Sequence, residues 1–342
     1  MLYSLLRPLL FQMSPEKAHD AAICALAKGL VPAQPQVHDD RLHTHFAGLE
    51  LPNPVGLAAG FDKNARTLAH LFAQGFGFAE VGTITPKPQA GNPKPRIFRL
   101  KEQEAIINRL GFNNEGLTAA IARLQKPQHG IVGANIGKNK DSEDAVADYV
   151  TGLKGVYGLC DYVTVNISSP NTAGLRDLQQ AGALGELLDA LLHARATLEG
   201  TKPLFVKIAP DMDDTQLEAV VGLALEKGID GLIISNTTIA RPEGISQEAG
   251  GLSGKPLFTA STAMLRRAYQ LSGGKLPLIG VGGIASADDA YGKILAGASA
   301  VQLYSALIYQ GFELVTRIKL GLIERLERDG FANVGEAVGK AA

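Results

Sequence analysis

Short apolar runs rich in valine and isoleucine alternate, from residue 55 onward, with longer segments whose apolar residues recur at helical spacing. The runs predict eight strands, at residues 55–58, 78–81, 130–136, 162–167, 204–208, 231–234, 277–281 and 300–303. The segments predict helices at residues 115–124, 184–198, 215–226, 262–271 and 287–295. Nearly continuous apolar strands are typical of parallel sheets that are covered on both faces. Eight of them, each followed by a helix, predict a closed (β/α)8 barrel of the TIM type.

The residues before the barrel predict two short helices outside it. The first is a leucine-rich segment at residues 2–11 that carries Arg7. Ser14, Pro15 and Glu16 predict the start of the second, with a capping serine, a proline in the first turn and an acid near the positive end of the helix dipole. We divide the chain into this extension, residues 1–40, and the barrel, residues 41–342. The helices either contact a membrane or only plug the bottom of the barrel.

Composition excludes several classes of function. The chain has 342 residues and a formal net charge of −1, which gives no electrostatic footprint for nucleic acid. Its two cysteines, Cys24 and Cys160, are expected to be buried, and with the scattered histidines they form neither a disulfide framework nor a metal site. We recognise no signal peptide and no apolar run near the roughly 18 residues of a spanning helix, so we expect a soluble or peripheral protein.

Polar residues gather where the predicted strands end, which is where barrels of this kind carry their chemistry. Asn135, Asn166 and Asn236 lie at the ends of strands three, four and six, and Lys63 and Lys207 at the ends of strands one and five. One asparagine would mean little. Three of them with two lysines predict a planar polar ligand that is held by amide hydrogen bonds and positive charge.

Glycine turns follow the late strands. Residues 251–254 precede the helix after strand six, and residues 280–283 end strand seven. Such turns, opening onto helix amino-termini, often hold a phosphate in barrels, although they can also serve only as tight turns. We favour a phosphate site.

Two hypotheses follow from the residues alone. In one, the barrel binds a flavin phosphate and Lys207 neutralises the reduced ring. In the other, Lys207 or Lys63 is the nucleophile of a Schiff-base aldolase. The polar cluster consists mainly of amides and hydroxyls, which favours redox chemistry on a bound cofactor.

Seven motifs resemble the dihydroorotate dehydrogenase family, and the likeness extends from the amino-terminal helices to about residue 325. They are GLAAGFDK (56–63), NRLGFNN (108–114), NIGKNK (135–140), NISSPNT (166–172), VKIAPD (206–211), GGLSG (250–254) and IGVGGI (279–284). Family members that use soluble acceptors carry a cysteine where this chain has Ser169. A serine there, with the helical extension, resembles the quinone-reducing, membrane-associated class, which implies an FMN enzyme of pyrimidine synthesis.

The resemblance also implies residue roles. Ser169 would be the base, hydrogen-bonded to Thr172, and Lys207 would stabilise charge on the flavin. Residues expected to hold FMN are Ala59, Gly60, Lys63, Thr83, Asn135, Asn166, Lys207, Ser235, Gly254, Gly283, Tyr304 and Ser305. Residues expected to hold dihydroorotate are Lys63, Asn108, Arg109, Leu110, Gly111, Phe112, Asn166, Asn171, Asn236 and Thr237. Ser235 departs from the family pattern, which often has threonine, but keeps the hydroxyl.

The expected partners follow from the same resemblance. A quinone tunnel would lie between the two short helices and the flavin, with His19, Arg99 and Tyr304 near its inner end. The protein would bind the cytoplasmic face of the cell (inner) membrane peripherally through these helices, as a monomer. Residues 169–182 have little helical period and predict a mobile lid over the base.

Overall fold

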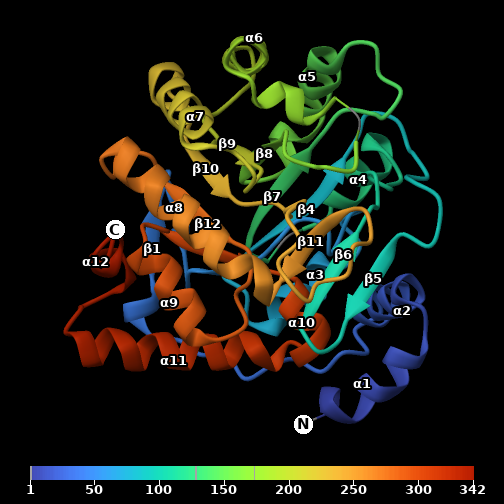
Figure 1. Cartoon of the computed structure of the whole chain (residues 1–342), viewed down its shortest axis with the longest axis vertical. Helices are drawn as coiled ribbons and strands as arrows, with labels where there is room; N and C mark the ends of the chain where they lie inside the picture. The colour runs from blue at the N-terminus through green and yellow to red at the C-terminus, as the bar shows by residue number, and fades with distance from the viewer. Residues whose placement is uncertain (1, 128, 173) are drawn as a thin grey trace.

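The computed structural model describes residues 2–127, 129–172 and 174–342. Its centre is a closed barrel of eight parallel strands, arranged in space in the order of the chain (Figure 1). The last strand pairs with the first, with Val301 opposite Val55. The strands are β3 (Val55–Leu57), β4 (Phe78–Ile84), β7 (Ile131–Ile136), β8 (Tyr162–Asn166), β9 (Leu204–Ile208), β10 (Gly231–Ile234), β12 (Leu278–Val281) and β13 (Ala300–Leu303). The predicted (β/α)8 barrel is confirmed.

Helices surround the barrel and complete the fold. They are α3 (Leu68–Leu71), α4 (Leu117–Leu124), α5 (Ala145–Val156), α6 (Ala181–Ala196), α7 (Asp214–Lys227), α8 (Phe258–Ser272), α9 (Ala287–Leu295), α10 (Ser305–Gln310), α11 (Glu313–Asp329) and α12 (Val334–Ala337). The apolar pattern predicts five of these. It identifies neither the long α11 nor α5, in which Gly152 and Gly155 weaken the helical signal. Helix α7 begins at a capping box, in which Asp213 accepts from Gln216 N and the Gln216 side chain accepts from Asp213 N.

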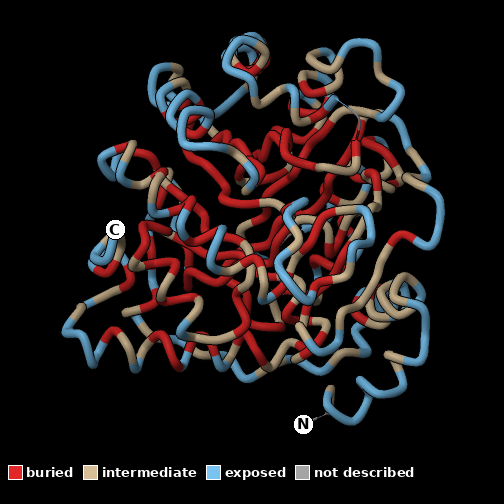
Figure 2. The backbone as a smooth tube through the Cα atoms, viewed as in Figure 1, coloured by how far each residue is buried: buried red, intermediate tan, exposed pale blue. Residues whose placement is uncertain are grey.

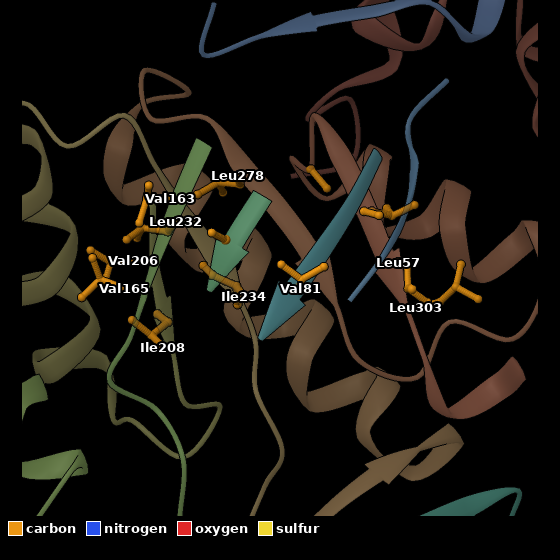
Figure 3. Packing of buried hydrophobic residues seen from close by; sticks show 14 of the residues in the cluster. Leu57, Val81, Val163, Val165, Val206, Ile208, Leu232, Ile234, Leu278 and Leu303 are labelled. Atoms are coloured by element: carbon orange, nitrogen blue, oxygen red, sulfur yellow. The ribbon is translucent and has the colours of Figure 1, made fainter. Parts of the chain in front are cut away.

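Side chains along each strand alternate between the barrel interior and the surrounding helices. Leu232 and Ile234 of β10 point outward into the layer that packs beneath the helices, where Val163 and Val206 also lie (Figure 3). Ile233, between them, belongs to a separate cluster inside the barrel. Because alternate positions face inward, a strand that is mostly apolar can still place a polar side chain in the barrel interior.

A β-hairpin closes the amino-terminal end of the barrel. It consists of β1 (Thr44–Phe46) and β2 (Leu49–Leu51). Phe46 stacks on Phe205 with ring centroids 5.7 Å apart, in a buried cluster with Tyr162. The alternative that the two amino-terminal helices plug this end is therefore wrong, because the hairpin fills it.

A three-stranded antiparallel sheet that the sequence pattern does not predict lies at the opposite end. It contains β5 (Ile97–Leu100), β6 (Ala105–Asn108) and β11 (Gly251–Gly254). Strands β5 and β6 leave the barrel after β4, and β11 leaves it after β10. Since both excursions start at carboxyl ends of barrel strands, the sheet lies beside the polar strand ends.

The predicted helical extension is present as α1 (Leu2–Gln12) and α2 (Pro15–Ala27), which lie against α10 and β5 (Figure 1). The Ser14 side chain makes no capping hydrogen bond, although the second helix begins where predicted. Leu5 and Leu9 are 74% and 61% exposed, and most of α1 is exposed (Figure 2). None of the described helices is long and apolar enough to cross a membrane.

Polar contacts fix the extension to the barrel. The Arg99 guanidinium of β5 donates to Leu10 O in α1 at 3.2 Å. The buried Arg96 guanidinium pairs with Glu16 of α2, with 2.6 Å between Nη2 and Oε1. Both arginines come from the β4–β6 excursion, so this excursion positions the two helices.

Candidate active site

The carboxyl ends of the barrel strands open into a cavity of about 700 Å³. The same cavity reaches the space between the strand ends and the helices α1 and α2. Lys207 and Asn236 line its polar part, and Leu6 and Ala22 line its apolar part. A concave, mainly apolar space with a few convergent polar groups is typical of a small-molecule site.

Most of the predicted site residues line this cavity. Among those expected to hold a cofactor, they are Ala59, Gly60, Lys63, Thr83, Asn166, Lys207, Ser235, Gly254, Gly283, Tyr304 and Ser305. Among those expected at the substrate or the quinone, they are Asn108, Leu110, Gly111, Phe112, Asn171, Asn236, Thr237, His19 and Arg99. Ser169 also lies at the wall. The structure thus brings these residues together, and their individual roles stay predictions.

Arg109, Asn135 and Thr172 do not line the cavity. The Arg109 guanidinium donates to Glu248 at 2.8 Å and lies 4.7 Å from the centre of the Phe98 ring. Its side chain is therefore engaged by Phe98 of β5 and by the segment before β11, not by the cavity. Asn135 and Thr172 are buried, and Asn135 is hydrogen-bonded to the wall residues Thr83 and Asn166.

A buried hydrogen-bond network links the asparagines at the strand ends. Asn166 Nδ2 donates to Thr83 Oγ1 at 2.9 Å and to Asn135 Oδ1 at 3.2 Å. Thr83 Oγ1 donates to Asn135 Oδ1 at 2.6 Å, and Asn135 Nδ2 donates to Glu80 Oε1 at 2.7 Å. Asn166 Oδ1 accepts from Ser168 Oγ at 2.8 Å. Because every amide atom in this chain has a partner, the network fixes the orientation of Asn166 at the wall.

Glu80 is an important residue that the sequence reasoning missed. It is fully buried inside the barrel. Besides Asn135, it accepts from Gln302 Nε2 at 3.0 Å, Thr164 Oγ1 at 3.1 Å and the Tyr162 hydroxyl at 3.2 Å. A buried carboxylate needs such donors to offset its lost hydration. A single acid inside the apolar run at 78–81 is the signal that could have identified it.

Two lysines, the buried Lys207 and the half-buried Lys63, give the cavity positive charge. Burial lowers the pKa of Lys207, while Glu80 partly opposes this shift. Lys207 Nζ has no hydrogen-bond partner among the residues that the structure describes, so a ligand can use its charge. Lys63 Nζ donates to Gly60 O at 2.8 Å, and burial lowers the pKa of Lys63 to about 8 against the opposing charge of Asp20.

Ser169 is 5% exposed, and its Oγ accepts a hydrogen bond from Asn171 N at 3.2 Å. The Asn171 side chain is held in turn by Asn108 O at 3.1 Å. Thr172 Oγ1 is buried without a hydrogen-bond partner in the described part of the chain. The expected hydrogen bond between Ser169 and Thr172 is therefore not formed.

The predicted lid, residues 169–182, is tied to the strand ends through Arg176. The Arg176 guanidinium donates to Ser168 O and to Thr237 O, each at 3.1 Å, and pairs with Asp211 at 2.9 Å. These partners follow β8, β10 and β9, so one side chain links the segment to three strands. Residue 173 lies outside the described residues, and the mobility of the segment stays a prediction.

The glycine turn after β12 has the geometry of an anion site. Gly282 and Gly283 line the cavity with φ values of 107° and 78°, a region that disfavours other residues. A Cβ atom on Gly283 would lie 2.5 Å from Phe258 N, so the turn packs directly on the start of α8. The amino-terminus of a helix carries partial positive charge, which suits a phosphate.

Aromatic rings line the cavity between its polar part and its helical end. His19 and Phe61 meet edge to face with ring centroids 5.6 Å apart, and Phe61 meets Tyr304 at the same distance. Burial lowers the pKa of His19 to about 3, so the imidazole is neutral at physiological pH. Sequence reasoning missed Phe61, although it lies within the motif at 56–63.

The described residues contain no group of three or more histidine, cysteine or acidic side chains that could hold a metal ion. Cys160 is buried as expected, but Cys24 is exposed on α2, which corrects that expectation. The helix turns Cys24 away from the barrel, and the apolar sequence around it does not reveal this.

Comparison with known proteins identifies the family. The model of the family described as dihydroorotate dehydrogenase matches residues 41–326. Proteins named dihydroorotate dehydrogenase (quinone) from Azorhizobium caulinodans and Parvibaculum lavamentivorans are 53% and 54% identical to this chain, and each alignment covers 99% of the chain and 98% of the relative.

Solved structures agree with these relatives. The Eimeria tenella DHODH in complex with ferulenol superposes with a TM-score of 0.92 at 43% identity, covering 95% of both chains. The ligand-free form of that protein has the same TM-score at 44% identity. A family match over most of the chain, and relatives that are more than half identical over nearly all of it, show that the chain belongs to the dihydroorotate dehydrogenase family.

Proposed function

We propose that this chain oxidises dihydroorotate to orotate with a bound FMN and delivers the electrons to a membrane quinone. The observation that carries the proposal is the single cavity that joins the polar strand ends to the apolar helices. Such a space can hold a polar substrate, a flavin and an apolar acceptor next to one another. Membership of the family sets the Schiff-base aldolase hypothesis aside.

Members of the family are flavoenzymes, and three features of this chain favour FMN. The Gly282–Gly283 turn and the start of α8 suit one phosphate. Lys207 offers a buried cation at the wall that no described residue pairs with, and it can stabilise negative charge on a flavin ring. The Asn166 amide is held at a fixed orientation. When bound, the flavin supplies the hydride acceptor that no side chain of the protein provides.

The substrate has a carboxylate and a cyclic imide-like edge. Lys63 is the cation that suits the carboxylate, while Asn108, Asn171 and Asn236 offer paired amide donors and acceptors for the ring. These side chains are half-buried, which strengthens their polar contacts with a ligand relative to contacts made in open water. Their fixed partners limit the cost of ordering them when substrate binds.

Ser169 is the proposed base. The hydrogen bond from Asn171 N stabilises negative charge on Ser169 Oγ, which helps the hydroxyl to give up its proton as it accepts one from the substrate carbon. The Thr172 hydroxyl lies three residues along the chain and is buried without a partner among the described residues. We assign it, directly or through water, to the onward transfer of the proton.

The apolar end of the cavity is the proposed quinone path, with His19, Arg99 and Tyr304 near its inner end. A neutral His19 suits an uncharged quinone. The exposed Leu5 and Leu9 of α1 suit peripheral contact with the cytoplasmic face of the inner membrane. We further propose that the protein acts as a monomer and binds no nucleic acid.

An absorption spectrum of the purified protein tests the proposal. We expect flavin bands that dihydroorotate bleaches under anaerobic conditions and that a quinone, but not NAD, restores. Heat release should liberate FMN. A colourless active enzyme, an adenine dinucleotide in the released fraction, or restoration by NAD alone would contradict it.

A further inference from the structure

Lys293 of α9 is a fully buried lysine that none of the roles above uses. Charged lysines are almost never fully buried unless an opposite charge compensates them. Among the described residues, no carboxylate forms a salt bridge with Lys293. The charge of Asp289 raises the pKa of Lys293 to some extent. The Asp289 carboxylate, however, accepts hydrogen bonds from Ala285 N and Ser286 Oγ, each at 2.9 Å, at the start of α9.

The contacts of Lys293 lead to the glycine turn. Lys293 Nζ lies 2.6 Å from Ser261 Oγ in α8 and 3.5 Å from Val281 O at the end of β12. It also lies 5.3 Å from the centre of the Phe258 ring. Ser261 Oγ in turn lies 3.1 Å from both Gly282 O and Phe258 O, and it can donate its one proton to either carbonyl while it accepts from the ammonium.

These contacts set the direction of the Gly282–Gly283 peptide. In a trans peptide the C=O and the following N–H point in opposite directions. Because Gly282 O points toward Ser261, the Gly283 N–H points away from it, toward the cavity that Gly283 lines. Lys293 and Ser261 therefore support one side of the turn, while the Gly283 N–H on its other side faces the cavity.

We infer that Lys293 is a positioning residue and buried counter-charge for the phosphate of the flavin. The ammonium fixes the turn through Ser261 and supplies the positive charge that a phosphate dianion balances. The inference rests on the proposed binding of FMN. Burial lowers the pKa of Lys293 to about 7 in the protein without ligand, which is the penalty that a nearby anion would relieve.

The test separates the phosphate from the rest of the flavin. Full-length protein is stripped of flavin, and its dissociation constants for FMN and for riboflavin, which lacks the phosphate, are measured by fluorescence. We expect Lys293→Met, which keeps the length of the side chain but removes its charge, to weaken FMN on the order of tenfold or more. Riboflavin binding should change by less than about twofold, since an uncharged ligand gains little from the cation.

A second buried lysine provides the matched control. Lys319 of α11 is 2% exposed and donates to Gly75 O at 3.2 Å, in the segment before β4 and not at the glycine turn. Lys319→Met should leave the ratio of the two dissociation constants unchanged. Ser261→Ala, a smaller change, should lower the preference for FMN in the same direction and carries the test if Lys293→Met does not fold.

Equal weakening of FMN and riboflavin in Lys293→Met and Ser261→Ala would assign both residues a purely structural role and overturn the inference. Unchanged FMN binding in these variants would overturn it as well. A parent protein that binds neither flavin would instead refute the proposed function, so the two failures are distinguishable.

Discussion

At the scale of single residues, Ser169 is an unusual base, because a serine hydroxyl in water holds its proton tightly. We expect Ser169→Ala to bind flavin and substrate almost normally but to reduce its flavin about 10²–10⁴ times more slowly, the usual loss when a general base is removed. Ser169→Cys should retain part of the rate. Its rate should rise at lower pH than in the parent, because a thiol has a pKa of ~8.5. Anaerobic stopped-flow reduction by dihydroorotate across pH measures all three proteins. If Ser169→Ala reacts at the parental rate, another group takes the proton.

The charge of Lys207 should control the midpoint potential of the bound flavin. We expect Lys207→Ala to lower the midpoint potential of the bound flavin, because the variant loses the cation that stabilises negative charge on the ring. Lys319→Ala is the control, since this buried lysine does not line the cavity. The potential is measured with reference dyes on flavin-loaded protein. An unchanged potential would refute the role, and borohydride trapping of substrate on Lys207 would revive the aldolase hypothesis.

The charge of Lys63 should make the binding of orotate depend on pH. Its pKa is lowered to about 8, mainly by burial, and a lysine carries its charge below its pKa. The affinity for orotate, an anion, should therefore be constant at low pH and fall as the pH rises through about 8. Calorimetric titration of orotate from pH 6 to pH 10 measures this, with roughly tenfold weakening per pH unit at the upper end as the limiting slope. Constant affinity across that range would show that Lys63 does not bind the carboxylate of orotate.

The sequence predicted which residues belong to the site better than it predicted their contacts. Its motifs and the family resemblance together named most of the polar residues that line the strand ends. They also named Arg109, whose side chain pairs with Glu248, and a bond between Ser169 and Thr172 that is not formed. A motif fixes the position of a residue along the chain, whereas the direction of its side chain depends on partners from distant segments.

At the scale of secondary-structure elements, the eight strands were predictable because each is a continuous apolar run. The β5–β6–β11 sheet was not, because β11 pairs with β6 only after the chain has passed through four further barrel strands. The antiparallel pairing of Gly251 with Asn108 spans more than a hundred residues of sequence, which no local pattern reveals.

The glycine turn after β12 gives a prediction at this scale. Gly283→Ala should weaken flavin binding by about tenfold or more, because its φ of 78° costs an alanine roughly 1–2 kcal/mol and the new Cβ would lie 2.5 Å from Phe258 N. Gly222→Ala is the matched control, since Gly222 is an exposed position in α7 with no atom within 4 Å of the added Cβ. Flavin content after gel filtration measures both. Full occupancy in Gly283→Ala would show that the turn tolerates the side chain.

At the scale of the whole molecule, deletion of residues 1–30 should separate the two half-reactions. The polar strand ends belong to the barrel, whereas α1 and α2 form the wall at the other end of the cavity. The truncated protein should still bleach its flavin with dihydroorotate, but should reduce long-chain quinones poorly and lose its affinity for liposomes. Normal quinone turnover would refute the assignment of the tunnel.

The variant Leu5→Ser with Leu9→Ser is the control for that deletion, because both side chains are exposed and neither lines the cavity. It should lose liposome binding and retain reduction of short-chain quinones. If dihydroorotate reduces the flavin normally in both proteins and only the truncated one reduces short-chain quinones poorly, membrane contact and the wall of the tunnel are separate functions of the helices. The sequence could predict these helices, but not that Arg96 and Arg99 of a distant excursion hold them there.

The two unlike ends of the cavity have a consequence for inhibition. Polar residues at the strand ends define one end, and apolar side chains of α1 and α2 define the other. A compound that wedges between the helices therefore need not resemble dihydroorotate, and no concentration of dihydroorotate can displace it. Since α1 and α2 lie outside the barrel, their lining can diverge between organisms while the strand ends stay the same. Species-selective drugs against such an enzyme should therefore bind at the end of the cavity that α1 and α2 line.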